Sequence, residues 1–335
     1  VVALSLIILL ALSSTILNSP ALRSQTTLPS PPSAVSEDQD FAFAYGLYKD
    51  NLFQHALEQF DKFVGKFPNS LRRGEAEFLA IECRYQLEQY EIVVRLLSRY
   101  VQDYPTSQLA DDAYFRLGEA QLKLNNITGS IAAFKTVLDK FGERELAGEA
   151  AYWVGEASVR VQDYDAALKY YTLAYEHYPK NRLRDYAVYS VAWTYQRSKE
   201  YEKAVAWYEK LVAEFPESGL VSASKVRVAE CYYYVTEYQR AIDYLTVAKP
   251  TIKEMQEQAE ADYLVAEAYY HLENYAEAQR RYEQFLIGHP ANRLEREVTY
   301  ALGWSMMKQQ EFSLAADFFG RLVSGSDPLA HAGLY

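Results

Sequence analysis

Residues 200–218 read EYEKAVAWYEKLVAEFPES. Large apolar side chains and alanines recur at helical spacing and Pro216 follows them, so the stretch predicts an amphipathic helix that ends near this proline. Two close copies are DYDAALKYYTLAYEHYPKN at 163–181 and NYAEAQRRYEQFLIGHPAN at 274–292. A helix that is written several times in one chain indicates a repeat architecture.

The copies follow a constant period of 37 residues. Most units have a small residue equivalent to Ala204, with a large side chain three residues before it and another four residues after it. These positions share one helical face, on which the small side chain lets a neighbouring helix approach closely. This face predicts the second helix of every unit, and the equivalent positions are Ala56, Val93, Ser130, Ala167, Ala204, Ala241, Ala278 and Ala315.

A first helix is predicted around a further position, twelve residues before each of these, which is small in every unit except the second, where it is Ile81. In most units a proline follows the second helix and stops it, and in the sixth unit Pro250 comes three residues early. The first-helix positions are Ala44, Ile81, Gly118, Gly155, Ala192, Ala229, Ala266 and Gly303. Residues 37–332 therefore predict eight helix–turn–helix units, which start near residues 37, 74, 111, 148, 185, 222, 259 and 296.

The units resemble tetratricopeptide repeats, whose signature includes a small residue three before a tyrosine, the spacing A-x3-F and a closing proline. Ala192 with Tyr195, Ala204 with Tyr208, and Pro216 match it in one unit. A second unit matches at Val265, Ala266, Tyr269, Ala278, Tyr282 and Pro290. The leading tryptophan is largely absent, and the period is longer than the usual ~34 residues. The resemblance implies an all-α fold, a right-handed α-solenoid of about eight helix–turn–helix repeats.

A narrower resemblance concerns YPTSQLADDAYFRLGEAQLKL at 104–124. This segment is similar to repeat proteins of the bacterial envelope, of the type found in the Tol–Pal system and in the outer-membrane assembly machinery. The turns FPNS, YPTS and FPES share the pattern of an aromatic residue, a proline, a variable residue and a serine. The chain departs from the lipoprotein type because no cysteine follows its N-terminal apolar run. The resemblance implies an envelope scaffold.

Residues 1–21 begin with the apolar run VVALSLIILLALSSTIL and carry no charge. This run has the length of a signal-peptide core and is shorter than the roughly 20 residues that span a bilayer. The first residue is not Met and no basic segment precedes the run, so an uncleaved membrane anchor is an alternative to a cleaved signal. Residues 22–36 predict a flexible Pro/Ser-rich linker, and residues 333–335 the start of a truncated ninth repeat.

The composition contains no pattern typical of catalysis, so neither an enzyme nor a cofactor or metal site is expected. The five histidines form no metal-ligand spacing, and no glycine-rich phosphate loop is present. A net charge of −11 argues against nucleic acid as a partner. Cys83 and Cys231 are four periods apart, so they are predicted to be unbonded core residues of different units.

The first helices are expected to line the concave face of such a solenoid. At the positions of these helices that point outward, aromatic side chains and glutamates recur from repeat to repeat. Aromatic anchors beside unpaired carboxylates suit an extended basic peptide, or one that bears tyrosine and arginine. The alternatives are that the rings pack between helices and that the glutamates only confer solubility. The predicted partner-binding residues are Glu82, Glu119, Glu156, Glu230, Glu267, Tyr152, Tyr189, Trp193, Tyr263 and Trp304.

The sequence thus predicts a non-catalytic protein–protein interaction scaffold of the bacterial cell envelope, in the periplasm or tethered to the membrane at its N-terminus. One alternative is the repeat arm of a larger enzyme or export machine whose active domain lies beyond residue 335. Another is a membrane-anchored adaptor that faces the cytosol. The sequence does not name the partner.

Overall fold

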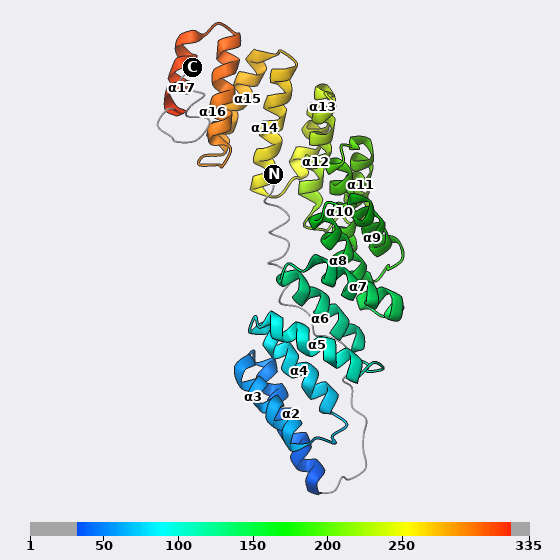
Figure 1. Ribbon diagram of the computed structural model, residues 1–335. Helices are drawn as coiled ribbons and strands as arrows, with labels where there is room; N and C mark the ends of the chain where they lie inside the picture. Colours follow the sequence, from blue (N-terminus) through cyan, green and yellow to red (C-terminus); the bar gives the residue numbers. More distant parts are fainter. Residues whose placement is uncertain (1–31, 323–335) are drawn as a thin grey trace. The chain divides into compact units, whose positions relative to one another are not determined.

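The computed structural model describes residues 32–322, and this part of the chain contains only helices and connecting turns (Figure 1). The predicted signal or anchor at 1–21, residues 22–31 of the predicted linker and the ninth-repeat start at 333–335 lie outside the described residues. The helices are α2 (Pro32–Lys49), α3 (Phe53–Lys66), α4 (Arg73–Gln86), α5 (Tyr90–Asp103), α6 (Ala110–Lys123), α7 (Ile127–Phe141), α8 (Leu146–Arg160), α9 (Tyr164–Glu176), α10 (Arg184–Arg197), α11 (Tyr201–Glu214), α12 (Val221–Tyr234), α13 (Tyr238–Ala248), the 3-10 turn η2 (Lys249–Thr251), α14 (Met255–His271), α15 (Tyr275–Gly288), α16 (Glu295–Lys308) and α17 (Phe312–Leu322).

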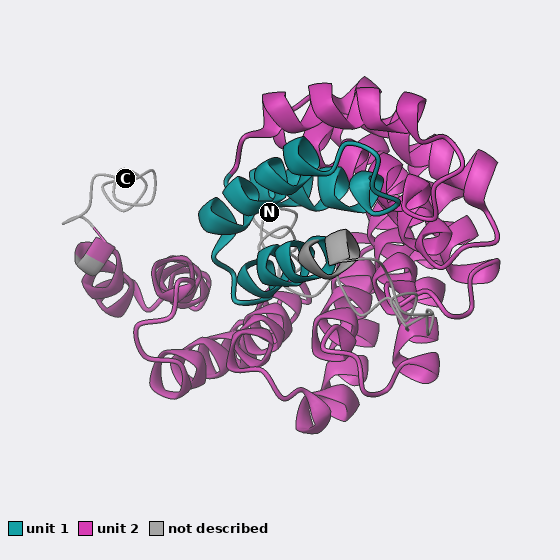
Figure 2. Cartoon of the chain, turned by 90° about the horizontal axis from the view of Figure 1, so that it is seen from below, with its two compact units in different colours: residues 1–87 teal, residues 88–335 magenta. Residues whose placement is uncertain are grey.

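The chain divides into two compact units, residues 1–87 and 88–335, which Figure 2 colours separately. In the described part of unit 1, α3 packs against both α2 and α4. In unit 2, each helix from α5 to α17 packs against the next one along the chain. The first helices α12 and α14 also contact each other, as do α14 and α16. The prediction of an all-α fold of stacked helix–turn–helix repeats is confirmed.

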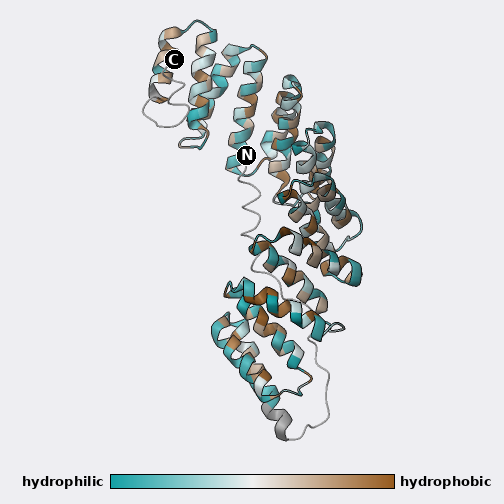
Figure 3. Cartoon of the chain, in the orientation of Figure 1, coloured by the Kyte–Doolittle hydropathy of each residue, from teal (hydrophilic) through white to brown (hydrophobic). Residues whose placement is uncertain are grey.

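Small residues bring the two helices of each hairpin together. The contact position of the first helix and that of the second helix are buried in all eight repeats, and they are small in most of them. At Gly155 the approach is so close that an added Cβ would lie 2.6 Å from the ring of Tyr171, and at Gly118 it would lie 2.7 Å from Phe134. Figure 3 shows apolar and hydrophilic residues side by side along the helices, as expected when one face of each is buried.

The turn inside each hairpin contains one residue with a left-handed backbone, and in no case is that residue glycine. In repeat one, the N–H of Asn51 donates to Tyr48 O and the N–H of Leu52 donates to Leu47 O, which is the Schellman pattern that closes a helix. The second helix then begins two residues after the left-handed one. These left-handed residues recur with the 37-residue period, at Asn51, Glu88, Asn125, Gln162, Lys199, Thr236, Glu273 and Gln310.

Five of the seven linkers between the described repeats are closed by a serine or asparagine side chain, and the third and sixth are not. Ser107 Oγ accepts from the N–H of Leu109 at 3.1 Å, and Asn181 Oδ1 accepts from the N–H of Leu183 at 3.0 Å. Such local bonds stabilise a turn that the preceding proline has already begun. They explain the recurring turns FPNS, YPTS, YPKN, FPES and HPAN.

The sixth linker departs from this pattern but keeps the period. Helix α13 ends at Ala248, η2 contains the early Pro250, and α14 begins at Met255. The second helix is therefore shorter than in the other interior repeats, and the following first helix is longer. Ile252, which is 2% exposed, anchors the linker in the core.

Cys83 on α4 and Cys231 on α12 are free and buried, which confirms the prediction for both residues. Burial is the main reason why the pKa of each thiol rises to about 12, and the adjacent glutamates, Glu82 and Glu230, raise it further. The thiols therefore stay protonated at neutral pH and act as small core side chains.

Thr236 is β-branched and has a φ of 63°, a combination that is strained. We expect Thr236→Gly to raise the free energy of unfolding by about 1 kcal/mol, because glycine adopts this backbone without a steric cost. Urea unfolding followed by circular dichroism measures the change. Asn125→Gly is the matched control with a gain near zero, since asparagine tolerates a left-handed backbone. A less stable Thr236→Gly protein would contradict this explanation.

Candidate functional site

Two of the residues predicted to face a partner are interior. Tyr152 on α8 is 0% exposed, and Tyr189 on α10 is 4% exposed. Their rings pack against Tyr171 and Tyr208 of the second helix in the same hairpin, with centroids 5.5 and 5.4 Å apart. The prediction that they supply contact area for a partner is therefore wrong, because the second helix already covers them.

The other three predicted aromatic residues remain accessible to different degrees. Trp304 on α16 is 39% exposed, whereas Trp193 on α10 and Tyr263 on α14 are half-buried. The guanidinium of Arg197 lies 5.6 Å from the ring centroid of Trp193. These three residues stay candidates for partner contact.

The five predicted glutamates occupy one equivalent position of α4, α6, α8, α12 and α14, and we call them the ladder glutamates: Glu82, Glu119, Glu156, Glu230 and Glu267. Glu82 is only 2% exposed, so it is not a surface carboxylate. The side chains of Glu119 and Glu230 are 16% and 20% exposed. Every ladder glutamate has an interaction within the protein. The prediction of unpaired carboxylates is therefore wrong.

Two ladder glutamates accept a hydrogen bond from a tyrosine of the second helix, fifteen residues later. The Tyr171 hydroxyl donates to Glu156 Oε1 at 2.5 Å, and the Tyr282 hydroxyl donates to Glu267 Oε1 at 2.6 Å. Both tyrosine side chains are buried, and a buried hydroxyl needs an acceptor. The glutamate thus allows the hairpin to bury its tyrosine, because it accepts the hydrogen bond of the hydroxyl.

Two other ladder glutamates pair with an arginine three residues earlier on the same helix. Arg116 bonds Glu119, and Arg227 bonds Glu230. The second helices of these repeats carry Phe134 and Leu245 at the position of the buried tyrosine, so they offer no hydroxyl. The sequence signal for the two pairings was available, because an arginine stands three residues before Glu119 and Glu230. The same place holds Leu79, Trp153 and Leu264 before the other three ladder glutamates.

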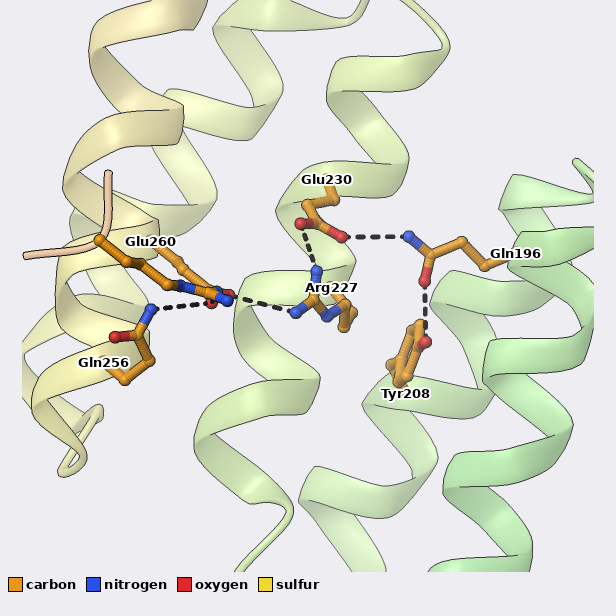
Figure 4. A network of polar contacts seen from close by, with 7 residues as sticks. Gln196, Tyr208, Arg227, Glu230, Gln256 and Glu260 are labelled. Carbon is orange, nitrogen blue, oxygen red and sulfur yellow. Dashed lines mark hydrogen bonds and ion pairs between the residues drawn. The ribbon is translucent and has the colours of Figure 1, made fainter. Parts of the chain in front are cut away.

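Figure 4 shows a polar network that joins three successive repeats. Arg227 on α12 donates to Glu230 on the same helix and to Glu260 on α14, the latter at 3.1 Å. Gln196 on α10 donates to Glu230 at 3.1 Å and accepts from the Tyr208 hydroxyl at 2.8 Å. Repeat five has Trp193 in the ladder position, and Gln196 takes the place of the missing carboxylate as the acceptor for Tyr208.

The same network reaches the linker after α15. Gln256 donates to Glu260 at 3.2 Å, and Arg293 also bonds Glu260. Charge-assisted bonds in a partly buried site hold side chains in one arrangement. The first helices of repeats five to seven therefore present polar groups whose positions are fixed by the fold.

A separate cavity of about 290 Å³ lies at the irregular sixth linker and is lined by Lys249, Gln258, Asp262, Arg281, Gln284, Phe285, Gly288 and His289. Asp262 bonds Lys249 and lies 2.8 Å from His289 Nε2, and Arg281 pairs with Glu277. The charged groups of the cavity are therefore satisfied within the protein, and the cavity is a weaker candidate than the first-helix face.

Within residues 32–322, no cluster of three or more His, Cys, Asp or Glu side chains could hold a metal ion. Over the same described stretch, no helix combines the length and the apolar character needed to cross a membrane.

Burial raises the pKa of Glu156, although the hydrogen bond from Tyr171 favours the charged form. A carboxyl whose pKa is higher in the folded protein contributes its full stability below the unfolded pKa. It loses stability as the pH rises through the folded pKa. The charge of Glu156 therefore costs stability at pH 7.

We expect Glu156→Gln to leave the protein as stable as the wild type at pH 7 or more stable, because glutamine keeps the acceptor for Tyr171 and removes the buried charge. The difference from the wild type should shrink at a pH near 4.5, where Glu156 is protonated. Urea unfolding at both pH values tests this. Glu119→Gln is the matched control and should lose on the order of 3 kcal/mol, since its charged bond with the largely buried Arg116 is lost. A clear loss of stability in Glu156→Gln at pH 7 would contradict the assignment.

Comparisons with known proteins agree with this architecture. Tetratricopeptide-repeat profiles match residues 115–182, 186–218 and 263–331, which together make up about half of the chain. The C-terminal part of a repeat-containing protein from Cytophaga hutchinsonii has a similar fold, with a TM-score of 0.63 at 18% identity over 78% of this chain and 99% of that one.

Two further solved structures resemble the chain. The apo form of RapI has a TM-score of 0.58 at 16% identity over 86% of each chain. A repeat protein from Parabacteroides merdae has a TM-score of 0.50 at 14% identity over 81% of this chain and 99% of that one. These identities show a shared fold and nothing finer, and no curated protein matches the sequence. The matched profiles and the paired helices with small contact positions show that the chain belongs to the tetratricopeptide-repeat family.

Proposed function

We propose that the protein is a non-catalytic scaffold that binds segments of other proteins on the face formed by its first helices. The observation that carries this proposal is the row of first helices in unit 2, where α12 contacts α14 and α14 contacts α16. Each further helix in such a row extends the surface without a new fold. The polar groups on that surface are already ordered by the network around Arg227 and Glu260. An ordered surface loses less entropy when it binds a partner.

A solved complex provides a precedent for the fold. The structure of Naa15 with Naa10, bound to HypK, matches 89% of this chain with a TM-score of 0.52 at 14% identity, and the match covers 44% of that chain. The accessible first-helix residues Trp193, Tyr263 and Trp304 are proposed to contact the partner. Glu267, which accepts hydrogen bonds from Tyr233 and Tyr282, gives the surface a negative charge that favours a basic partner.

We further propose that the protein acts in the bacterial cell envelope. The apolar run within residues 1–21 and the Pro/Ser-rich residues 22–36 support delivery across a membrane. The resemblance of residues 104–124 to envelope repeat proteins supports the same location. The partner is then an envelope protein with an exposed extended segment.

Photo-crosslinking in cells tests the binding face. A photoreactive phenylalanine analogue in place of Trp193 or Trp304 should give discrete crosslinked proteins, because both side chains lie on the first helices. The same analogue in place of Ile287, which is 81% exposed on the second helix α15, is the control and should give none of these products. Equal crosslinking at Ile287, or none at the two tryptophans, would contradict the proposed face.

An enzyme fusion tests the location. Alkaline phosphatase fused after Tyr335 should be active in cells, because this reporter becomes active only outside the cytoplasm. A matched fusion that lacks residues 1–21 should stay inactive, since the proposed export segment is missing. Equal activity of the two fusions, or an inactive full-length fusion that is stably expressed, would contradict an envelope location.

A further inference from the structure

Seven aromatic rings form a continuous series across the hairpin turns of repeats five to seven. We call this series the aromatic strip, and its members are Tyr201, Tyr233, Tyr234, Tyr238, Tyr270, His271 and Tyr275. Two near-parallel stacks anchor it: Tyr201 on Tyr234 with centroids 5.5 Å apart, and Tyr238 on His271 with centroids 5.0 Å apart. Tyr233 joins the stacks, since its centroid lies 6.1 Å from that of Tyr234 and 5.2 Å from that of Tyr238.

The strip is accessible. Tyr234 is 53% exposed, His271 is also exposed, and the other five rings are half-buried. A structural core would cover the rings on both sides, as happens at Tyr152. Clustered aromatic side chains that keep open surface are typical of binding sites.

The residue type that creates the strip is unusual for its position. Tyr234 and His271 are the last residues of the first helices α12 and α14. At a helix C-terminus a cation interacts favourably with the helix dipole, and five of the eight first helices end in one. The last residues of the eight first helices are Lys49, Gln86, Lys123, Arg160, Arg197, Tyr234, His271 and Lys308. Only repeats six and seven replace the usual cation with a ring.

The strip also lacks the cation that neighbouring rings possess. In the same three repeats, Tyr195, Tyr232 and Tyr269 each have a basic side chain of the second helix over the ring. Lys203 Nζ lies 5.2 Å from the Tyr195 centroid, and the Arg240 guanidinium lies 4.2 Å from that of Tyr232. Arg281 is 5.6 Å from the third ring. Among the described residues, no lysine or arginine lies over a tyrosine of the strip.

Carboxylates lie close to the strip. Glu267 Oε2 accepts from the Tyr233 hydroxyl at 3.5 Å. Burial, followed by the charge of Glu267, raises the pKa of Tyr233, and burial, followed by the charge of Glu230, raises that of Tyr234. Glu267 therefore makes the potential at the Tyr233 hydroxyl more negative, whereas at Tyr234 the charge of Arg227 acts against that of its partner Glu230.

We propose that the aromatic strip binds arginine and lysine side chains of an extended basic segment of a partner protein. The open rings would receive cations as the neighbouring tyrosines Tyr195, Tyr232 and Tyr269 already do, and Glu267 would attract them. This inference rests on the proposed scaffold function and adds a second contact surface, at the turns, with a stated partner chemistry.

Binding of a labelled peptide tests the proposal. The probe is a fluorescein-labelled peptide with four Gly-Arg-Pro repeats, and its reference has citrulline in place of arginine, which keeps the shape and removes the charge. We expect the arginine peptide to bind the wild-type protein at least tenfold more tightly than the citrulline peptide in fluorescence polarisation. Equal binding of the two peptides would overturn the proposal.

The decisive variant is Tyr234→Arg with His271→Arg, which restores the kind of residue that other repeats carry at this position. It should keep the wild-type circular dichroism and weaken binding of the arginine peptide at least tenfold. Val161→Arg with Ile287→Arg adds the same charge at exposed positions outside the strip and should change binding less than threefold. His271→Tyr keeps the ring and should retain binding. Unchanged binding in the decisive variant, or an equal loss in the charge control, would overturn the proposal.

An open aromatic surface could also bind sugars, and a neutral oligosaccharide tests this alternative. If cellohexaose bound to the wild type and this binding were lost in Tyr234→Arg with His271→Arg, the strip would be a sugar platform and the proposal would be wrong. Crosslinking at Trp193 and Trp304 is independent of the strip. Crosslinks without peptide binding would therefore remove only this inference, whereas absent crosslinks would remove the proposed first-helix face.

Discussion

The close contact between a small residue on one helix and a large ring on the next is the interaction on which this structure depends. A single hairpin has an apolar face that it cannot cover alone, so it is stable only where neighbouring hairpins cover that face. Alanine or glycine at the contact allows the helices to approach, and rings such as Tyr171 and Phe134 fill the space beside them. This contact keeps the repeat length constant at 37 residues. If the sequence shifted by one residue, a large side chain would point to a place where only a small one fits.

The use of tyrosine as the large residue places a further demand on the sequence. A phenol that packs as well as phenylalanine also brings a hydroxyl, which must find an acceptor once it is buried. Glu156, Gln196 and Glu267 provide that acceptor for the second-helix tyrosines. In repeats three and six, where the second helix carries Phe134 or Leu245 at this position, an arginine on the first helix pairs with the glutamate instead. Much of the polar pattern on the first helices thus follows from the composition of the second helices.

The fold could be predicted from the sequence, but only part of the site could. Period and turn residues are local features, and they placed Ala204 and Gly155 in helix contacts that the structure confirms. Exposure depends on which neighbouring side chain covers a residue, so the outward phase of a first helix did not reveal that the second helix covers Tyr152 and Tyr189. The partners of the glutamates were missed for a related reason. The choice between tyrosine and arginine requires both helices of a hairpin to be compared together.

The irregular sixth linker shows which feature stays constant from one repeat to the next. Helix α13 stops early and α14 starts early, yet the left-handed turn residues Thr236 and Glu273 on either side keep their full spacing. The repeat is thus defined by the distance between equivalent hairpin tips, and the boundary between helix and linker can move within it. A chain built in this way can acquire a local novelty, such as the cavity beside Lys249, without disturbing the units before and after it. The sequence of one linker can therefore change in evolution while the spacing of the hairpins on both sides stays the same.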